Sequence, residues 1–376
     1  MILSRTQSDV KAAVREFAQN AIKPKSNEFE KAGRYPTEVF LELGEMGLLG
    51  MTAPESVGGA GSDYVSYALA LIELAAADGA LSTIVSIQNS IMVQGILRFG
   101  SKAQQQRYLP DLISGKVIGA FALTEADAGS DAASIRTRAV KTEKGWRING
   151  TKQFITSGKI AGVAMITAVT DPAAGKRGLS CFLVPTSTSG YEVAGIESKL
   201  GQQASDTCSL RFENLDVPAD ALFGEEGHGY KVALANLETG RIGIAAQSVG
   251  MAQAALEIAI DYAKQRKSMG KAIFDHQAVG FRLASLATKL EAARQLVLHA
   301  ASLKDAGEPC IKEASMCKLM ASETAEEVVS GAMQTLGGYG YTEDYGVAKI
   351  YRDVRVCQIY EGTSDIQRMV IARELA

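Results

Sequence analysis

Apolar residues recur at helical spacing in the first and last thirds of the chain. Residues Tyr64 to Ala77 and Leu81 to Phe99 are apolar on broad faces, and Gly100 is placed to end the second helix. The same periodicity covers 232–267, 276–303 and 311–336. Long helices with short connections are typical of a bundle, so this pattern predicts helical domains at both ends.

Short alternating runs of apolar and polar residues replace this pattern between about 118 and 222. They predict strands over 163–169, 179–184 and 208–212. Asn149-Gly150 lies between two further runs, and both residues tolerate positive φ. This pair therefore predicts a tight β-hairpin.

The order of these hydrophobic patterns along the chain predicts an α+β fold in three domains. An N-terminal all-helical domain is expected over 1–117, a small middle β-barrel or sandwich domain over 118–222, and a C-terminal four-helix bundle over 223–376. A chain of 376 residues is also too long for one small core.

Composition narrows the classes of function. Net charge is −3 and no basic stripe occurs, so nucleic-acid binding is not supported. The five cysteines form no CxxC pair and the three histidines have no metal-ligand spacing, which favours free thiols, a reducing compartment and no metal. No signal peptide or membrane span is recognised at the sequence level, so we expect a cytoplasmic protein of bacterial type.

The segment from Gln358 to Arg368 carries the clearest chemical signal. Glu361 stands between an aromatic residue and a glycine, Tyr360 and Gly362. A carboxylate beside an apolar ring in a dry cleft has a raised pKa, which suits a general base near neutral pH. Alternatively, Glu361 supplies negative charge to a helix that begins near Ser364.

A second signal is the run from Phe121 to Asp131. A strand that leads into a turn of Gly, Ser and Asp exposes backbone N–H groups, which can hold phosphate oxygens. An ordinary β-turn explains the same residues. The chain has neither a strand-borne GxGxxG nor a Walker loop, so classical dinucleotide and P-loop sites are not supported.

Together these motifs resemble the acyl-CoA dehydrogenase family over essentially the whole chain. The helix–β–helix order agrees, as does the run Tyr360-Glu361-Gly362-Thr363-Ser364 near the end. The resemblance implies FAD as cofactor, an acyl-CoA thioester as substrate, and α,β-dehydrogenation to a trans-2-enoyl-CoA. It also implies electron-transfer flavoprotein as electron acceptor, in fatty-acid β-oxidation or branched-chain amino-acid degradation.

The resemblance assigns one group of flavin contacts to the middle domain. Thr124 would hydrogen-bond the flavin, Ser130 would reach the pyrophosphate or the pantetheine, and Thr156 would donate to N5. Phe154 would cover the ring where many relatives carry Trp, although a buried strand aromatic is its plainer interpretation. The remaining predicted contacts here are Phe121, Leu123, Gly129 and Ile155.

A second group of flavin contacts is assigned to the C-terminal domain. Arg266 would cross a dimer interface to the partner's flavin pyrophosphate, although a helix-end charge is the alternative. The Gly337-Gly338 loop would also cross, although a glycine pair there could simply cap a helix. The other predicted contacts are Ser268, Phe274, Gln277, Gln334, Thr363 and Asp365. Two motifs that reach across subunits imply an obligate oligomer, a homotetramer built as a dimer of dimers.

The resemblance also places the chemistry. Glu361 would remove the α-proton, its backbone N–H and a ribityl hydroxyl would stabilise the developing enolate, and the β-hydride would pass to flavin N5. Some branches of the family carry the base at the position of Gly240. Because glycine cannot accept a proton, this departure supports Glu361 as the base. Arg241 would be a nearby cation that also contacts substrate, or else part of a structural ion pair.

The remaining predictions concern the substrate. Glu238 would hydrogen-bond the pantetheine arm, unless it is a solvated helix carboxylate. Ser130, Tyr360 and Gly362 complete the predicted substrate contacts. The segments 240–247 and 311–316 resemble short-chain members, so C4–C6 chains, including 2-methyl-branched ones, are expected. An acyl-CoA oxidase and an enoyl-CoA reductase of the same fold are the rival enzymes, and a non-enzymatic flavoprotein scaffold is a further rival.

Overall fold

The computed structural model describes residues 1–376, and its N-terminal part is helical. Side-chain caps fix four helix starts here. Asp63 and Asp78 accept from the amides of Ser66 and Leu81, and Ser4 and Ser101 form capping boxes. The predicted helix over 81–99 is interrupted by a π-helical stretch, Gln88–Val93. The helices are α1 (Arg5–Phe17), α2 (Ser26–Ala32), α3 (Thr37–Glu45), α4 (Tyr64–Ala77), α5 (Gly79–Ile87), α6 (Gln94–Phe99) and α7 (Lys102–Ile113).

The middle part is one eight-stranded sheet around its own core, in which Trp146 packs edge-on against Phe182 at 5.3 Å between ring centroids. Strand order is β6-β7-β3-β2-β4-β5-β8, with β1 parallel to β4. The strands are β1 (Gly119–Ala122), β2 (Arg138–Thr142), β3 (Gly145–Thr156), β4 (Val163–Val169), β5 (Leu179–Pro185), β6 (Tyr191–Ile196), β7 (Thr207–Pro218) and β8 (Leu222–Phe223).

The hairpin predicted at Asn149-Gly150 is wrong. Both residues lie inside β3, which pairs with β2 on one side and β7 on the other, and the turn lies between Thr142 and Gly145 instead. Gly150 occupies a register irregularity at φ 149°, and a Cβ there would lie 2.5 Å from the Thr137 hydroxyl. Gly150 is therefore required by a bulge in a long strand, where a side chain would clash with Thr137.

The C-terminal part is the predicted helical bundle. It contains α8 (Gly229–Gln265), a short ribbon of β9 (Lys267–Ser268) and β10 (Lys271–Ala272), then α9 (Gln277–Asp305), α10 (Ile311–Leu336), α11 (Val347–Val354) and α12 (Ser364–Leu375). Helix α8 packs against α10 and α9 within the bundle and against α4 of the N-terminal part. One continuous core therefore joins the two helical parts.

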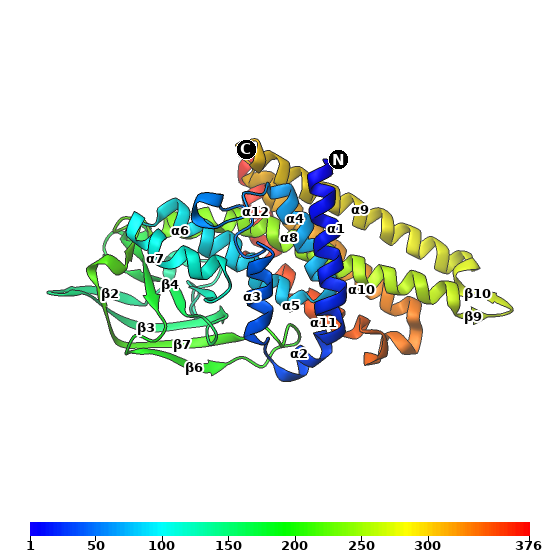
Figure 1. Ribbon diagram of the computed structural model, residues 1–376, viewed down its shortest axis with the longest axis horizontal. Coiled ribbons are helices and arrows are strands. Elements are labelled where there is room, and N and C mark those ends of the chain that lie inside the picture. The colour runs from blue at the N-terminus through cyan, green and yellow to red at the C-terminus, as the bar shows by residue number, and fades with distance from the viewer.

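The molecule is elongated, with the sheet at one end and the β9–β10 ribbon at the other (Figure 1). Helix α8 runs along the long axis between them. Two segments, Gly79–Phe99 and Gly229–Gln265, are long and apolar enough to cross a membrane, but 83% and 89% of their most apolar windows are buried in the fold. Their apolar composition is thus explained by the core that they build.

Candidate active site

The loop before α12 has an unusual backbone. Glu361 has φ 53° and Gly362 has φ 85°, and a non-glycine residue rarely adopts the left-handed region. The Gln367 side chain donates to the carbonyls of both residues, at 3.0 and 2.9 Å, and Lys318 Nζ donates to that of Gly362 at 2.8 Å. Side chains from α12 and α10 therefore fix the direction in which Glu361 points.

The Glu361 side chain points back toward α8. A Cβ added to Gly240 would lie 2.7–2.8 Å from all three atoms of the carboxylate, so the carboxylate occupies the space that a side chain at 240 would need. Its Oε2 atom is buried and has no hydrogen-bond partner. Burial raises the pKa of Glu361 to about 7, although Arg241 and Lys318 pull it down.

Glu361 lies two residues before the N-cap of helix α12, outside the first turn of that helix. Helix α12 begins at Ser364, where Thr363 Oγ1 accepts from the amide of Ile366 at 3.3 Å. Asp365 is the acidic residue of the first turn, and it is exposed and lies 3.4 Å from Arg368.

Arg241 is buried next to Glu361 without an ion pair. Its Nη1 donates to Ser315 Oγ at 3.3 Å, and its Nε has no partner. Burial lowers its pKa, and Glu361 is the largest influence in the opposite direction. The alternative of a structural ion pair is wrong, because no carboxylate oxygen lies within 4.0 Å.

Glu238, one turn of α8 before Ile242, is paired. Lys304 Nζ donates to Oε1 at 2.7 Å, and Cys310 Sγ lies 3.6 Å from the same oxygen. Burial alone would raise the pKa of Glu238, but Lys304 lowers it overall. It is therefore not a solvated helix carboxylate, and a substrate contact would have to share it with Lys304.

The hydroxyl of Tyr360 anchors the other side of the loop. It donates to Gln247 Oε1 at 2.8 Å and lies 3.3 Å from Gln202 Nε2 and 3.4 Å from Thr83 Oγ1. Gln247 in turn donates to Thr83 at 2.6 Å and to the Gly79 carbonyl at 2.8 Å. This network, on α8 two turns beyond Gly240, was not predicted, because buried glutamines carry no sequence signal.

In the sheet domain, Phe154 presents its ring to solvent. It has φ 58° and is 60% exposed, so the plain interpretation of a buried strand aromatic is wrong. Thr124 and Thr156 are both partly exposed. Thr124 lies next to the strand that carries Phe154, because its carbonyl accepts from the amide of Gln153 at 2.9 Å. Ile155 faces the sheet core at 2% exposure, so only its backbone is available to a cofactor.

The loop from Leu123 to Thr137 is held by a buried ion pair that sequence reasoning missed. Lys152 Nζ donates to Glu125 Oε1 at 2.8 Å and to the Leu123 carbonyl at 2.9 Å. The same carboxylate accepts from the amides of Arg136 and Thr137. The clamp leaves Gly129 and Ser130 exposed at the loop tip, whereas Phe121 packs partly buried under the sheet.

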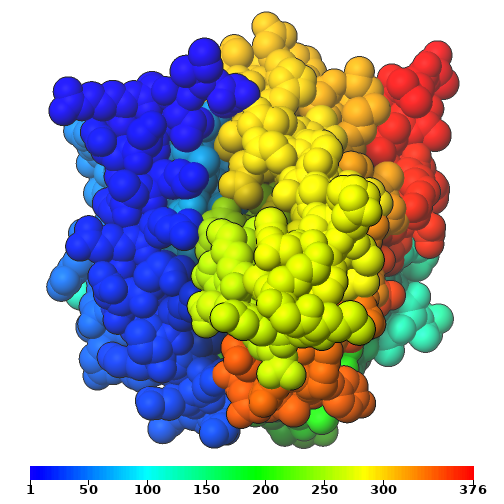
Figure 2. All heavy atoms as spheres, turned by 90° about the vertical axis from the view of Figure 1, so that its right-hand side faces the viewer, coloured from blue at the N-terminus to red at the C-terminus, as the bar shows by residue number.

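The second predicted group of flavin contacts lies at the far end of the bundle. Its members there are Arg266, Ser268, Phe274, Gln277, Gln334, Gly337 and Gly338, all exposed. Thr363 and Asp365, the other two predicted contacts of this group, lie instead at the start of α12 beside Glu361. Gly337 also ends α10 with φ 62°, so the capping explanation holds for it. Figure 2 looks onto this end, where the turn between α8 and α9 lies above the segment after α10. One chain does not bring this group to Phe154.

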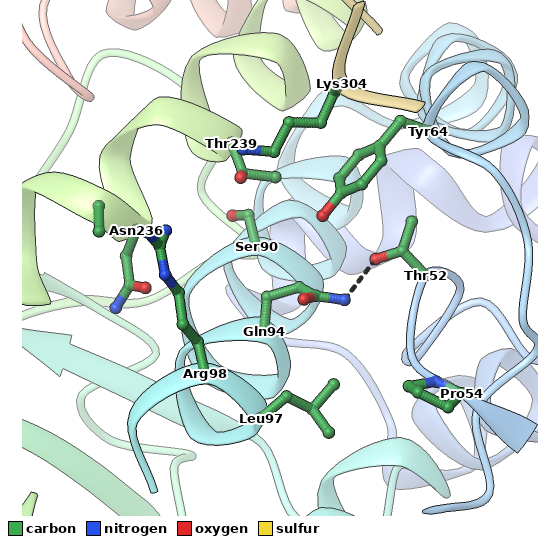
Figure 3. Close-up of a pocket in the computed structure, with 11 residues that line it drawn as sticks. Thr52, Pro54, Tyr64, Ser90, Gln94, Leu97, Arg98, Asn236, Thr239 and Lys304 are labelled. Atoms are coloured by element: carbon green, nitrogen blue, oxygen red, sulfur yellow. Dashed lines mark hydrogen bonds between the residues drawn. The ribbon is translucent and has the colours of Figure 1, made fainter. Parts of the chain in front are cut away.

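A cavity of about 500 Å³ opens beside α8, between α4, α6 and the end of α9 (Figure 3). Its lining is mostly polar: Arg98 and Lys304 extend into it, and Gln94 donates to Thr52 at 2.8 Å. Thr239 lines it, one residue before Gly240. None of the predicted site residues lines this cavity.

Three family models match successive parts of the chain. The acyl-CoA dehydrogenase N-terminal domain matches residues 4–116, the middle domain 120–215 and the C-terminal domain 227–376. The chain therefore belongs to the acyl-CoA dehydrogenase family, and it is an enzyme of that class. The predicted family, fold class and enzyme class are confirmed.

Full-length relatives have related names. An acyl-CoA dehydrogenase of Bacillus subtilis is 46% identical over 100% of this chain and 99% of that protein. The mitochondrial short-chain specific acyl-CoA dehydrogenase of Bos taurus is 42% identical over 99% of this chain and 90% of that protein. An acryloyl-CoA reductase (NADH) of Anaerotignum propionicum is also 42% identical, over 99% and 95%.

Solved structures give the same fold and the cofactor. Butyryl-CoA dehydrogenase from Megasphaera elsdenii superposes with a TM-score of 0.97 at 39% identity, covering 100% of this chain and 99% of that one. A chain from a study of the electron transferring flavoprotein of Acidaminococcus fermentans gives 0.98 at 40%, with the same coverage. A Mycobacterium smegmatis glutaryl-CoA dehydrogenase in complex with FADH2 gives 0.95 at 34%, covering 100% and 95%. Acyl-CoA dehydrogenases are FAD-dependent, and FAD is the cofactor of this chain.

Proposed function

We propose that this chain oxidises C4–C6 acyl-CoA thioesters, 2-methyl-branched ones included, to trans-2-enoyl-CoA, with Glu361 as the base. The observation that carries the proposal is a carboxylate oxygen buried without a hydrogen-bond partner, on a loop held in one conformation. A general base needs a free lone pair and a pKa near the working pH. The unpartnered Oε2 supplies the lone pair, and burial raises the pKa of Glu361 to about 7.

The loop also offers a donor for the thioester oxygen. The amide N–H of Glu361 takes part in no hydrogen bond within the protein. A preorganised N–H beside the base would stabilise the enolate that develops as the α-proton leaves, and one such donor is worth on the order of 3 kcal/mol. Arg241 would add a buried positive charge beside the carboxylate.

The sheet domain would hold the flavin. Phe154 would cover one face of the ring and exclude water, and Thr124 and Thr156 would offer hydroxyls at its edges. The hydride acceptor for the β-carbon would be supplied by FAD held by these residues. Gly129 has open space around its missing Cβ, which suits a close approach of phosphate to the loop backbone.

The path along α8 supports a short acyl chain. Beyond Gly240, a Cβ at Gly243 would meet Ser86 Oγ at 2.3 Å and Tyr67 Oη at 3.0 Å. Seven residues beyond Gly240, Gln247 is tied into the Tyr360 network. Seven residues span about 10 Å of helix, so buried side chains close the space near the base over a short distance.

A ladder of acyl-CoA substrates tests the proposal. We expect anaerobic bleaching of the flavin band to be fastest with C4–C6 chains, because Gln247 and Tyr360 limit the depth beside the base. Gln247→Ala, which shortens the side chain at that limit, should move the optimum to longer chains. A wild-type maximum at C10 or beyond would refute the short-chain assignment.

The reverse reaction is the second candidate. A relative of 42% identity is named acryloyl-CoA reductase (NADH), and the two directions need the same base and flavin. For the forward direction, electron-transfer flavoprotein is the proposed electron acceptor, supported by the neighbour from the flavoprotein study. Comparing flavin oxidation by an enoyl-CoA with flavin reduction by the acyl-CoA distinguishes the directions.

We further infer a homotetramer, built as a dimer of dimers. The predicted flavin contacts of the sheet domain and those between Arg266 and Gly338 lie toward opposite ends of one chain (Figure 1), so a partner subunit would have to complete each flavin site. Exposed apolar side chains at the bundle end, with Met269 at 92% and Tyr341 at 86%, support burial against a partner.

Arg266→Ala tests the shared flavin site. We expect flavin to bind about 10–100-fold more weakly, because a hydrogen bond to a charged group is worth about 1.5–3 kcal/mol. Equilibrium dialysis of FAD measures this loss. Lys264→Ala, another exposed cation two residues earlier, is the matched control and should leave the affinity unchanged. Unchanged affinity in Arg266→Ala would contradict the shared site.

A further inference from the structure

Lys318 is a buried lysine that the proposed reaction does not yet use. It lies on α10, fully buried, and no carboxylate oxygen lies within 4.0 Å of its ammonium group. Nζ donates to the carbonyl of Gly362 at 2.8 Å. Burying an ammonium group without an ion pair reduces the stability of the fold. A lysine in this position therefore suggests a functional role near Gly362.

The hydrogen bond acts on the loop that aims the base. Glu361 and Gly362 both have positive φ, and their carbonyls turn toward the interior. Gln367 on α12 donates to both carbonyls, and Lys318 on α10 donates to that of Gly362. An apolar side chain at 318 would leave Gly362 with Gln367 alone.

The charge of Lys318 acts on the same carboxylate. Arg241 and Lys318 are the two cations that lower the pKa of Glu361 against the effect of burial. Burial lowers the pKa of Lys318 itself to about 8. The other titratable or charged groups around this pair are Cys357 from the segment before the loop, Tyr67 from α4, Glu323 on α10, Arg373 from α12 and Tyr360. Burial raises the pKa values of the Cys357 thiol and the Tyr67 hydroxyl, so both stay neutral near pH 7.

We propose that Lys318 is a positioning residue of the reaction, which holds the Gly362 carbonyl and keeps a positive charge beside the base. The inference rests on the proposed role of Glu361. The hydrogen bond fixes the direction of the carboxylate, and the ammonium group favours its ionised, proton-accepting form. Below about pH 8 Lys318 is charged, so this help is present where the base works.

Two variants separate the hydrogen bond from the charge. Lys318→Met removes both, whereas Lys318→Gln removes the charge and keeps an N–H donor. Each removes a buried cation that has no ion pair, so we expect the fold and the flavin to be retained. Lys312→Met, on the same helix and partly exposed, is the matched control. The measurement is the pH dependence of flavin reduction by butyryl-CoA under anaerobic conditions.

In the wild type and the control, the rate should rise with pH through a limb near 7. In both Lys318 variants we expect that limb to move up by about one pH unit, because a nearby opposite charge shifts a carboxyl pKa by about 1–3 units. The plateau rate at high pH should fall about tenfold in Lys318→Met and remain closer to wild type in Lys318→Gln.

Other results would overturn the inference. An acid limb that stays in place in both variants would show that Lys318 does not act on the base. Loss of flavin or of the folded state in both would make Lys318 a structural residue only. Glu361→Gln, measured in parallel, separates this failure from that of the proposed function: if that variant reduces its flavin normally, the role of Glu361 itself is wrong.

Discussion

Glu361→Gln should keep a yellow, fully loaded enzyme that substrate no longer bleaches. Glutamine preserves the size of the side chain but cannot accept a proton, so we expect flavin reduction by butyryl-CoA to fall by several orders of magnitude. The residual rate should not depend on pH near 7, since the group with the raised pKa is gone. Stopped-flow absorbance at the flavin band measures both effects.

The loop itself should survive this substitution. Gln367 and Lys318 contact the backbone carbonyls of the loop and not the Glu361 carboxylate. Flavin content and thermal stability therefore serve as controls and should match the wild type. Reduction at a near wild-type rate by a fully loaded variant would exclude Glu361 as the base.

Gly240→Leu should abolish most activity from a position that carries no functional group. The carboxylate of Glu361 fills the space beside Gly240, and a Cβ alone would approach it to 2.7 Å. A leucine needs that space entirely, so the base must turn away from the substrate. Because misplacement of about 1 Å can cost about 100-fold, we expect flavin reduction to fall by at least that factor.

Gly240→Ala provides the graded comparison. At 2.7–2.8 Å the Glu361 carboxylate must move to make room for the Cβ, but it is the end of a flexible side chain and one methyl group requires only a small movement. We expect less than a tenfold loss of rate, with thermal stability unchanged or higher, because alanine favours a helix interior over glycine. Equal, wild-type rates in both variants would show that the carboxylate does not need its position against α8.

Periodicity predicted the helices well where local signals mark their ends. Helix α4 begins and ends as expected, since Asp63 caps its start and its face is apolar throughout. Strand β4 likewise matches its apolar run. Asn149-Gly150 failed because long-range pairing with β7 overrode the local turn preference, and the close approach of Thr137 explains the glycine. The turn preference of a dipeptide is a local property, and it takes no account of contacts with a distant strand or side chain.

The site could be predicted only in part. Glu361 stood out because a carboxylate between Tyr360 and Gly362 is chemically distinctive. Lys318 and Lys152 did not, since a lysine is usually solvated and its burial depends on elements distant in the sequence. Which chain completes a flavin site depends on the assembly, and the periodicity of one chain carries no information on it.

A crystal structure of the enzyme with FAD and a bound, unreactive butyryl-CoA analogue tests the central claim most directly. We predict a Glu361 carboxylate oxygen about 3–3.5 Å from the α-carbon, with the loop conformation retained. A carboxylate turned away into solvent, with another group against the α-carbon, would contradict it.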